Sequence, residues 1–257
     1  NIFVEKAKAS QKLIHAKTTD NHHLPDNYIK MLQEQYDPKL LKAYLDGQFV
    51  NLTSGSVYYA FDREIHVAKE YMEIMNGYPV NICIDFNVYP YSLSWNQVLA
   101  DNNVRFLGEW VSKSHSNTEE ACDEIIKLLP KDVDVVIYGD ASGRNGAANS
   151  TVSNYQIIDV KLKNYFRSVS YKVPTSNPAV KDRINCFNSK LSKNHITFNE
   201  CCIKLVQDLE QVVWNEKSTE LDKSNIERTH SSDGAGYFIN VEFPIQNIKL
   251  EQKTKSY

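Results

Sequence analysis

Hydrophobic and polar positions along the chain predict short strands that alternate with helices. Residues 80–85 read Val-Asn-Ile-Cys-Ile-Asp, a largely apolar run with the length and composition of a buried strand. Residues 91–100 and 104–111 alternate apolar and polar positions, and the Asp-Asn-Asn between them is typical of a hairpin turn. The first three strands are therefore predicted to be antiparallel.

Helical patterns follow these strands. Residues 118–129 place apolar side chains on one face, with Asn117 or Thr118 as the expected N-cap and Pro130 as the stop. The apolar run at residues 133–138 predicts a fourth strand. The later predicted elements are a helix ending near residue 162, strands at 165–173 and 195–198, and helices at 178–190, 200–214 and 233–243.

The order of these elements predicts the fold class. Three meandering strands, a helix and a strand that returns beside the first follow the order of a ribonuclease H-like domain. In that order the strands at residues 80–85 and 133–138 are neighbours, and their ends lie side by side. We predict an α/β fold, with a ribonuclease H-like mixed central sheet flanked by helices and an N-terminal helical connector arm.

The first part of the chain differs from the rest. Residues 1–60 have too little apolar periodicity for a core, and residues 27–45 predict two short helices split by Pro38. We predict a connector segment over residues 1–60 and the main domain over residues 61–257. Residues 57–67 mix aromatic and charged side chains and are expected on the surface of the main domain.

Three aspartates stand out as candidate site residues. Asp85 ends the first strand, Asp140 follows the fourth, and Asp233 precedes the small residues Gly-Ala-Gly. A carboxylate at the end of a buried strand is costly unless a positive charge compensates it, and we expect no basic side chain to neutralise this trio. Mg²⁺ and Mn²⁺ prefer carboxylate oxygens. The sequence therefore predicts a site for hard divalent cations.

Ordinary structural roles compete with metal binding. Asp140 could cap its own loop through Ser142 and Gly143, and Asp233 in its Ser-Ser-Asp-Gly context could be a helix N-cap. His230 could be a ligand or a polar loop residue. Capping is favoured for Asp233 taken alone, whereas metal binding is favoured when the three aspartates are taken together.

Composition and charge exclude several classes of protein. The formal net charge is -3, so any contact with nucleic acid requires a local basic patch. The five cysteines show no CxxC spacing, which argues against a zinc site or a disulfide framework. No apolar run approaches the length that spans a membrane.

Basic side chains are concentrated at residues 161–193, where Asp182 is the only acid. Such a run is either a solvated face or, if it lies beside the aspartates, a track for phosphate groups. The residues that we predict for such a track are Arg144, Lys161, Lys163, Arg167 and Lys172.

Three motifs taken together resemble one known family. They are IDFNVYP at residues 84–90, YGDASGR at 138–144 and HSSDGAGYF at 230–238. In this order they resemble the nuclease domain of the large terminase subunit of tailed bacteriophages. Residues 18–50 are similar to the segment that leaves the packaging ATPase domain of those proteins and enters the nuclease. The resemblance covers most of residues 15–243.

The resemblance implies a metal-dependent endonuclease site. Asp85, Asp140 and Asp233 match three acidic metal ligands of that family, and His230 matches a histidine that could bind a metal or the scissile phosphate. Two ions, Mg²⁺ or Mn²⁺, roughly 3.5–4 Å apart, would clamp a phosphodiester. Asp85 would bridge both ions, Asp140 would hold one and Asp233 the other.

The resemblance also implies a substrate and partners. The substrate would be double-stranded DNA, cut with little sequence preference when genome packaging starts and ends. The basic track would then contact DNA. In the full-length protein the phage portal and the small terminase subunit would be partners, in the cytoplasm of the host cell and without a membrane.

Two departures and three alternatives accompany this interpretation. The chain has no GxxxxGK[ST] loop, so a C-terminal fragment without ATP hydrolysis is expected, and Gly234 stands where the family commonly has Ala. A Holliday-junction-resolvase-like nuclease and a noncatalytic docking module of the packaging motor remain alternatives. A sugar kinase-like ATPase needs a glycine- and threonine-rich loop after the first strand, and the Phe-Asn-Val at residues 86–88 argues against it.

Overall fold

The computed structural model describes residues 18–21, 24–25, 27–36, 41, 45, 55–112, 114–145, 152–215 and 220–245. The chain divides into two units, one spanning Thr53–Ile245 and one made of Asn1–Leu52 with Gln246–Tyr257. In the latter, the described elements are the 3-10 helix η1 (Thr18–Asp20) and helix α1 (Tyr28–Gln35). Helix α1 agrees with the helix predicted before Pro38, and most of the helix predicted after it lies outside the described residues.

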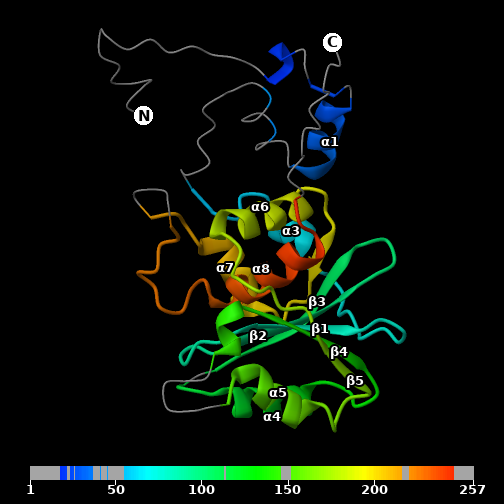
Figure 1. The fold of residues 1–257 in the computed structure, drawn as a ribbon, viewed down its shortest axis with the longest axis vertical. Helices are drawn as coiled ribbons and strands as arrows, with labels where there is room; N and C mark the ends of the chain where they lie inside the picture. The colour runs from blue at the N-terminus through cyan, green and yellow to red at the C-terminus, as the bar shows by residue number, and fades with distance from the viewer. Residues whose placement is uncertain are drawn as a thin grey trace, which may run out of the picture. The chain divides into compact units, whose positions relative to one another are not determined.

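A six-stranded mixed sheet forms the centre of the unit Thr53–Ile245 (Figure 1). Its strands are β1 (Val80–Asp85), β2 (Ser92–Val98), β3 (Val104–Val111), β4 (Asp134–Gly139), β5 (Ser168–Tyr171) and β6 (Ile196–Phe198), in the order β5-β4-β1-β2-β3-β6. Strands β1 to β3 are antiparallel, whereas β4 pairs parallel to β1. The predicted return of the fourth strand beside the first is confirmed.

The register of β1 against β4 places two aspartates at one end of the sheet. Ile84 pairs with Gly139 in this parallel ladder. The next residue along each strand direction is Asp85 on one side and Asp140 on the other. Because parallel strands run in the same direction, the two carboxylates leave the sheet at the same edge.

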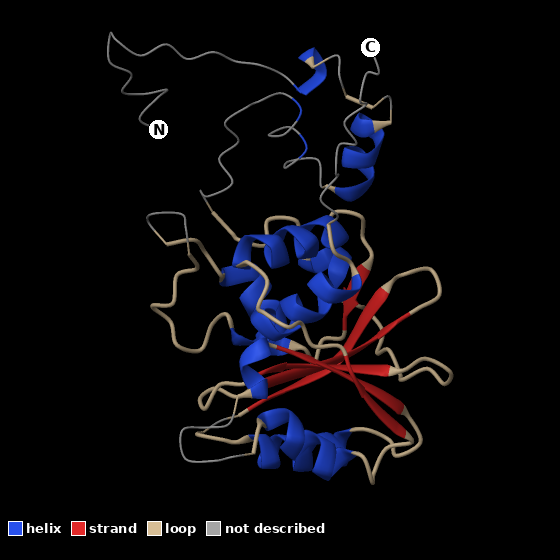
Figure 2. Ribbon diagram, viewed as in Figure 1, coloured by secondary structure: helices blue, strands red, loops and turns tan. Residues whose placement is uncertain are grey.

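Helices cover both faces of the sheet (Figure 2). Helices α4 (Thr118–Leu128) and α5 (Asn154–Leu162) pack on one face, and α6 (Val180–Leu191), α7 (Ile203–Gln211) and α8 (His230–Glu242) pack on the other. The short helix α3 (Arg63–His66) contacts β6, and the 3-10 helix η2 (Ala141–Arg144) follows β4. None of the helices in the described ranges combines the length and the apolar character needed to cross a membrane.

Alternation along β1 explains why its sequence reads as a nearly continuous apolar run. Ile82 and Ile84 belong to the core under α4 and α5, whereas Cys83 belongs to the core under α6, α7 and α8. A strand buried on both faces needs apolar side chains in both directions. The same alternation puts Asp85 on the side of α8.

One sequence prediction about this unit is wrong in part and another is wrong at its boundary. Residues 57–67 were expected on the surface, and residues 62–65 are exposed. Val57 and Tyr58 are instead 0% and 3% exposed, and the centroids of the Tyr58 and Phe187 rings lie 5.3 Å apart. Mixed aromatic and charged residues are compatible with burial when a helix such as α6 covers the aromatic ones. The last helix begins at His230 and not at Asp233, because its first turn is held by Asp208 of α7, which accepts a hydrogen bond from the Ser232 amide at 3.0 Å.

Candidate active site

The three aspartates and His230 line one cavity of about 720 Å³. Asp85 and Asp140 reach it from the ends of β1 and β4, and Asp233 reaches it from the first turn of α8. Helix α8 contacts both β1 and β4, so elements distant in sequence meet at this point. The structure therefore brings together the acids that the sequence singled out.

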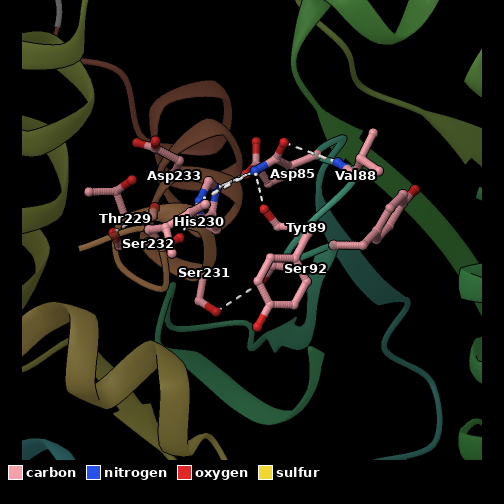
Figure 3. A network of polar contacts seen from close by, with 12 residues as sticks. Asp85, Val88, Tyr89, Ser92, Thr229, His230, Ser231, Ser232 and Asp233 are labelled. Atoms are coloured by element: carbon pink, nitrogen blue, oxygen red, sulfur yellow. Dashed lines mark hydrogen bonds and ion pairs between the residues drawn. The ribbon is translucent and has the colours of Figure 1, made fainter. Parts of the chain in front are cut away.

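Asp85 is joined directly to His230. Its Oδ2 lies 2.8 Å from Nδ1 of the imidazole (Figure 3). Nε2 of the same ring lies 3.1 Å from the carbonyl oxygen of Ile226. Burial lowers the pKa of His230, but the hydrogen bond to Asp85 and the charge of that carboxylate outweigh burial and raise it. The hydrogen bond to the Ile226 carbonyl also raises the pKa of this ring.

Asp140 caps the turn that follows β4. Its Oδ1 accepts hydrogen bonds from the Ser142 hydroxyl at 2.7 Å and from the Gly143 amide at 3.0 Å. The capping role considered for Asp140 is therefore present in the structure. Capping occupies Oδ1, and Oδ2 of this carboxylate accepts no hydrogen bond within the described part of the chain.

Two aromatic rings connect the segments that carry Asp85 and Asp140. Phe86 and Tyr155 pack over Gly143, where a Cβ atom would lie 2.4 Å from the Phe86 ring and 2.8 Å from the Tyr155 ring. The Tyr155 hydroxyl donates to the backbone carbonyl of Asp140 at 2.7 Å. Only glycine allows both rings to approach this closely, and the contact fixes the spacing between the two strand ends.

Asp233 lies inside α8 and not at its start. Its amide donates to the Thr229 carbonyl at 2.7 Å, so the N-cap interpretation is wrong for this residue. The next residue, Gly234, packs against the end of β1, because a Cβ atom there would lie 3.3 Å from the Asp85 amide nitrogen. This close approach brings Asp233 to the two strand ends.

Asp233 is neutralised by an arginine that the sequence analysis did not assign to the site. Nη1 of Arg183, on α6, donates to Oδ1 of Asp233 at 2.9 Å and to its carbonyl oxygen at 3.1 Å. The expectation that no basic side chain pairs with the trio is therefore wrong. Burial raises the pKa of Asp233 more than Arg183 lowers it, and the charge of Asp85 raises it further. A signal was present in the sequence, since Arg183 lies three residues after Val180 and four before Phe187, on one face of the helix predicted at residues 178–190.

The donor atoms suit a hard divalent cation, but their spacing does not form a closed shell. Among the described residues, no group of three or more His, Cys, Asp or Glu side chains is close enough to hold a metal ion. Within the same ranges, each aspartate keeps one oxygen without a hydrogen bond: Oδ1 of Asp85, Oδ2 of Asp140 and Oδ2 of Asp233. Three aspartates that line one cavity and each keep such an oxygen supply the donor chemistry that Mg²⁺ and Mn²⁺ prefer.

The basic residues predicted to contact DNA lie outside the residues described as lining the cavity. Four of them pair with acids: Lys161 with Asp123 at 2.9 Å, Lys163 with Asp159 at 3.6 Å, Arg167 with Asp134 at 2.6 Å and Lys172 with Glu242 at 2.7 Å. The fifth, Arg144, donates to the backbone carbonyls of Val173 and Pro174. Among the described residues, the basic side chains that line the cavity are Arg183, Lys223 and His230.

Comparison with known proteins identifies the fold. No protein-family model matches the sequence, and no curated protein matches it. The large terminase from a thermophilic bacteriophage, in complex with ATP-gamma-S, is similar with a TM-score of 0.64 and 21% identity over 89% of this chain and 55% of that one. The P22 large terminase nuclease domain has a TM-score of 0.55 and 14% identity over 76% of this chain and 96% of that domain.

These similarities confirm the predicted fold. The chain has the ribonuclease H-like fold of the phage large terminase nuclease domain, with a mixed sheet flanked by helices. It spans about 55% of the length of the full terminase that it matches.

Proposed function

We propose that the unit Thr53–Ile245 is a divalent-metal-dependent endonuclease domain of a phage terminase large subunit, which hydrolyses phosphodiester bonds of double-stranded DNA. One observation carries the proposal: Asp85, Asp140 and Asp233 converge on one cavity in a chain with the terminase nuclease fold. Ribonuclease H-like folds host many activities, so the acids at the site, and not the fold, support the chemistry.

The residues that would hold two divalent ions, Mg²⁺ or Mn²⁺, are Asp85 between the ions, Asp140 on one side and Asp233 on the other. Bound there, such ions supply an activated water and stabilise the charge on the leaving 3′ oxygen. The chain itself positions these ligands. The His230 ring orients Asp85, and the contact of Phe86 and Tyr155 over Gly143 sets the distance from Asp85 to Asp140.

The chain also supplies groups that would handle the substrate. The imidazole of His230 lines the cavity, and its Nε2–H would donate to a phosphate oxygen in place of the Ile226 carbonyl. The exposed side chain of Lys223 lines the same cavity and adds a positive charge for the DNA backbone. Contact of Arg144, Lys161, Lys163, Arg167 and Lys172 with DNA further from the cavity remains part of the proposal.

The proposal extends to the protein that contains this domain. It would cut genomes at the start and end of packaging in the host cytoplasm, with the phage portal and the small terminase subunit as partners. Residues 1–60 would then connect the nuclease to an ATPase motor domain.

The test is plasmid cleavage in Mg²⁺ or Mn²⁺, with EDTA as the negative condition. We expect Asp85→Asn to abolish cleavage while its circular dichroism stays that of the parent. The matched control is Asp101→Asn, which changes an exposed aspartate in the turn between β2 and β3, outside the residues described as lining the cavity. Cleavage by Asp85→Asn at the parental rate would refute the assignment.

The same assay separates the alternatives. A Holliday-junction-resolvase-like enzyme would cut four-way junctions and spare linear duplex, and a docking module would cut neither in any metal. If the basic track touches DNA, cleavage should also weaken steeply with added salt. A flat salt response would remove the track from the proposal.

A further inference from the structure

One cation already lies inside the cavity: the guanidinium of Arg183. Its side chain is only 7% exposed and donates twice to Asp233, to the carboxylate and to the backbone carbonyl. Its Cζ lies 4.3 Å from the centroid of the Tyr237 ring. Its Nε is buried and has no hydrogen-bond partner in the described part of the chain. Arg183 is therefore fixed by packing in a place where its hydrogen bonds are incomplete.

Charge is distributed unevenly among the three aspartates. Asp233 is paired with a permanent cation, since a guanidinium is not deprotonated in proteins. Asp85 is paired with His230, whereas Asp140 is held by the uncharged donors Ser142 and Gly143. The side of the cavity formed by Asp140 and Asp85 is therefore the more negative one.

A divalent ion would meet these two sides differently. Near Asp140 and Asp85 it finds carboxylate oxygens without a fixed cation. Near Asp233 it meets a guanidinium 2.9 Å from the oxygen of its intended ligand. Like charges at short range oppose each other strongly where water is excluded. Arg183 is 7% exposed and its Cζ lies 4.3 Å from the Tyr237 ring centroid, so an ion that uses Asp233 must compete with a buried guanidinium.

We propose that Arg183 is a built-in counter-ion that makes the two metal positions unequal. The chain alone binds one divalent ion readily through Asp140 and Asp85, and a second ion, through Asp233, only weakly. A phosphate of DNA supplies anionic oxygens that bind the guanidinium and the second ion together, so the substrate completes the site. Arg183 is thus a positioning residue. This inference rests on the proposed function of the three aspartates.

The test measures Mn²⁺ binding to the full chain without DNA, from the electron paramagnetic resonance signal of free Mn²⁺. The parent should bind one ion tightly and a second at least about tenfold more weakly. Arg183→Gln removes the charge and should tighten the second ion by at least about tenfold, the size of effect that a close charge has on a neighbouring ionic equilibrium. Arg183→Lys keeps the charge, so its second ion should stay weak.

A thermal measurement distinguishes this role from a purely structural one. Arg183→Gln should lower the melting temperature in EDTA, because it leaves Asp233 buried without a partner, and Mn²⁺ should raise that temperature more than in the parent. If Arg183 only links α6 to α8, the melting temperature falls but Mn²⁺ binding is unchanged, and the proposal is overturned. Two equally tight ions in the parent would also overturn it.

Controls keep the outcomes separable. Arg63→Gln removes an exposed arginine that pairs with Glu210 and should leave Mn²⁺ binding unchanged. If Arg183→Gln does not fold, Asp233→Asn replaces it: this variant should lose only the weak ion, and loss of the tight ion would overturn the proposal. If the parent binds no Mn²⁺ at millimolar concentration, the metal site itself fails. If the parent binds two Mn²⁺ ions with equal affinity and still cleaves DNA in a metal-dependent way, only the role proposed for Arg183 is refuted.

Discussion

Gly143→Ala is the sharpest test of how the cavity is built. The substitution adds one methyl group beneath the rings of Phe86 and Tyr155 and substitutes none of the proposed ligands. The Cβ atom would lie 2.4 Å from the Phe86 ring and 2.8 Å from the Tyr155 ring. Ordinary carbon contacts are about 3.5–4.0 Å, so the rings must shift by roughly 1 Å.

Three contributions set the size of the change in stability, two that lower it and one that raises it. Overpacking of this kind costs about 1–3 kcal/mol, and a lost hydrogen bond from the Tyr155 hydroxyl to the Asp140 carbonyl adds about 1 kcal/mol. Replacing glycine by alanine restricts the unfolded chain and returns about 0.4–1 kcal/mol. We therefore expect a net loss of roughly 1–3 kcal/mol in the free energy of unfolding.

Activity should fall further than stability. The displaced rings connect the segments that carry Asp85 and Asp140, and a misplacement of about 1 Å can reduce a rate by about 100-fold. Urea denaturation and plasmid cleavage measure the two quantities. In a double-mutant cycle, adding Phe86→Leu makes room for the methyl group and should recover part of the lost stability.

The refuting result is clear-cut. If Gly143→Ala is as stable as the parent and cuts at the parental rate, the two rings do not set the distance between the strand ends. If the double variant loses the sum of the stabilities that Gly143→Ala and Phe86→Leu lose separately, the added methyl group does not clash with the Phe86 ring.

Two further predictions concern the glycines of α8 and Asp208 of α7. Gly236→Ala should stabilise the protein by up to about 1 kcal/mol, because the added Cβ atom would make ordinary contacts of 3.5 Å or more. Gly234→Ala should stabilise it less or destabilise it, because its Cβ atom would lie 3.3 Å from the Asp85 amide nitrogen. Equal urea midpoints for the two variants would contradict this prediction. Burial of Asp208 raises its pKa to about 6, although the Ser232 amide hydrogen bond opposes the shift. The folded state therefore binds this proton more strongly than the unfolded state, and stability falls as pH rises from about 4 to about 6. Asp208→Asn should lack this fall, which is on the order of 2–3 kcal/mol, and parallel pH profiles of parent and variant would contradict the shift.

Local patterns were sufficient to predict the central part of the fold. The apolar runs of β1 and β4 and the hairpin between β2 and β3 follow from short-range periodicity, and the element order then placed the first and fourth strands together. The candidate site followed because Asp85 and Asp140 occupy the same position at the ends of neighbouring parallel strands. Both inferences need only strand direction and residue spacing.

The side-chain partners that helix packing brings together could not be predicted from the sequence. Arg183 contacts Asp233 only because α6 packs against α8. Asp208 holds the first turn of α8 only because α7 also packs against α8. Likewise, the acids that pair with Lys161 and Arg167 come from α4 and β4, outside the interval in which charges were counted. Such contacts depend on how helices are oriented over the sheet, which periodicity does not specify.

The position of α8 in the chain determines when the acids come together during synthesis. A nascent chain emerges from the ribosome N-terminus first, so the strands that precede Asp140 and carry Asp85 emerge well before the helix that carries His230 and Asp233. Until that helix docks on β1, a nascent chain holds only part of the acidic constellation. On the proposed function, the complete set of acids would therefore form only after synthesis has passed residue 242.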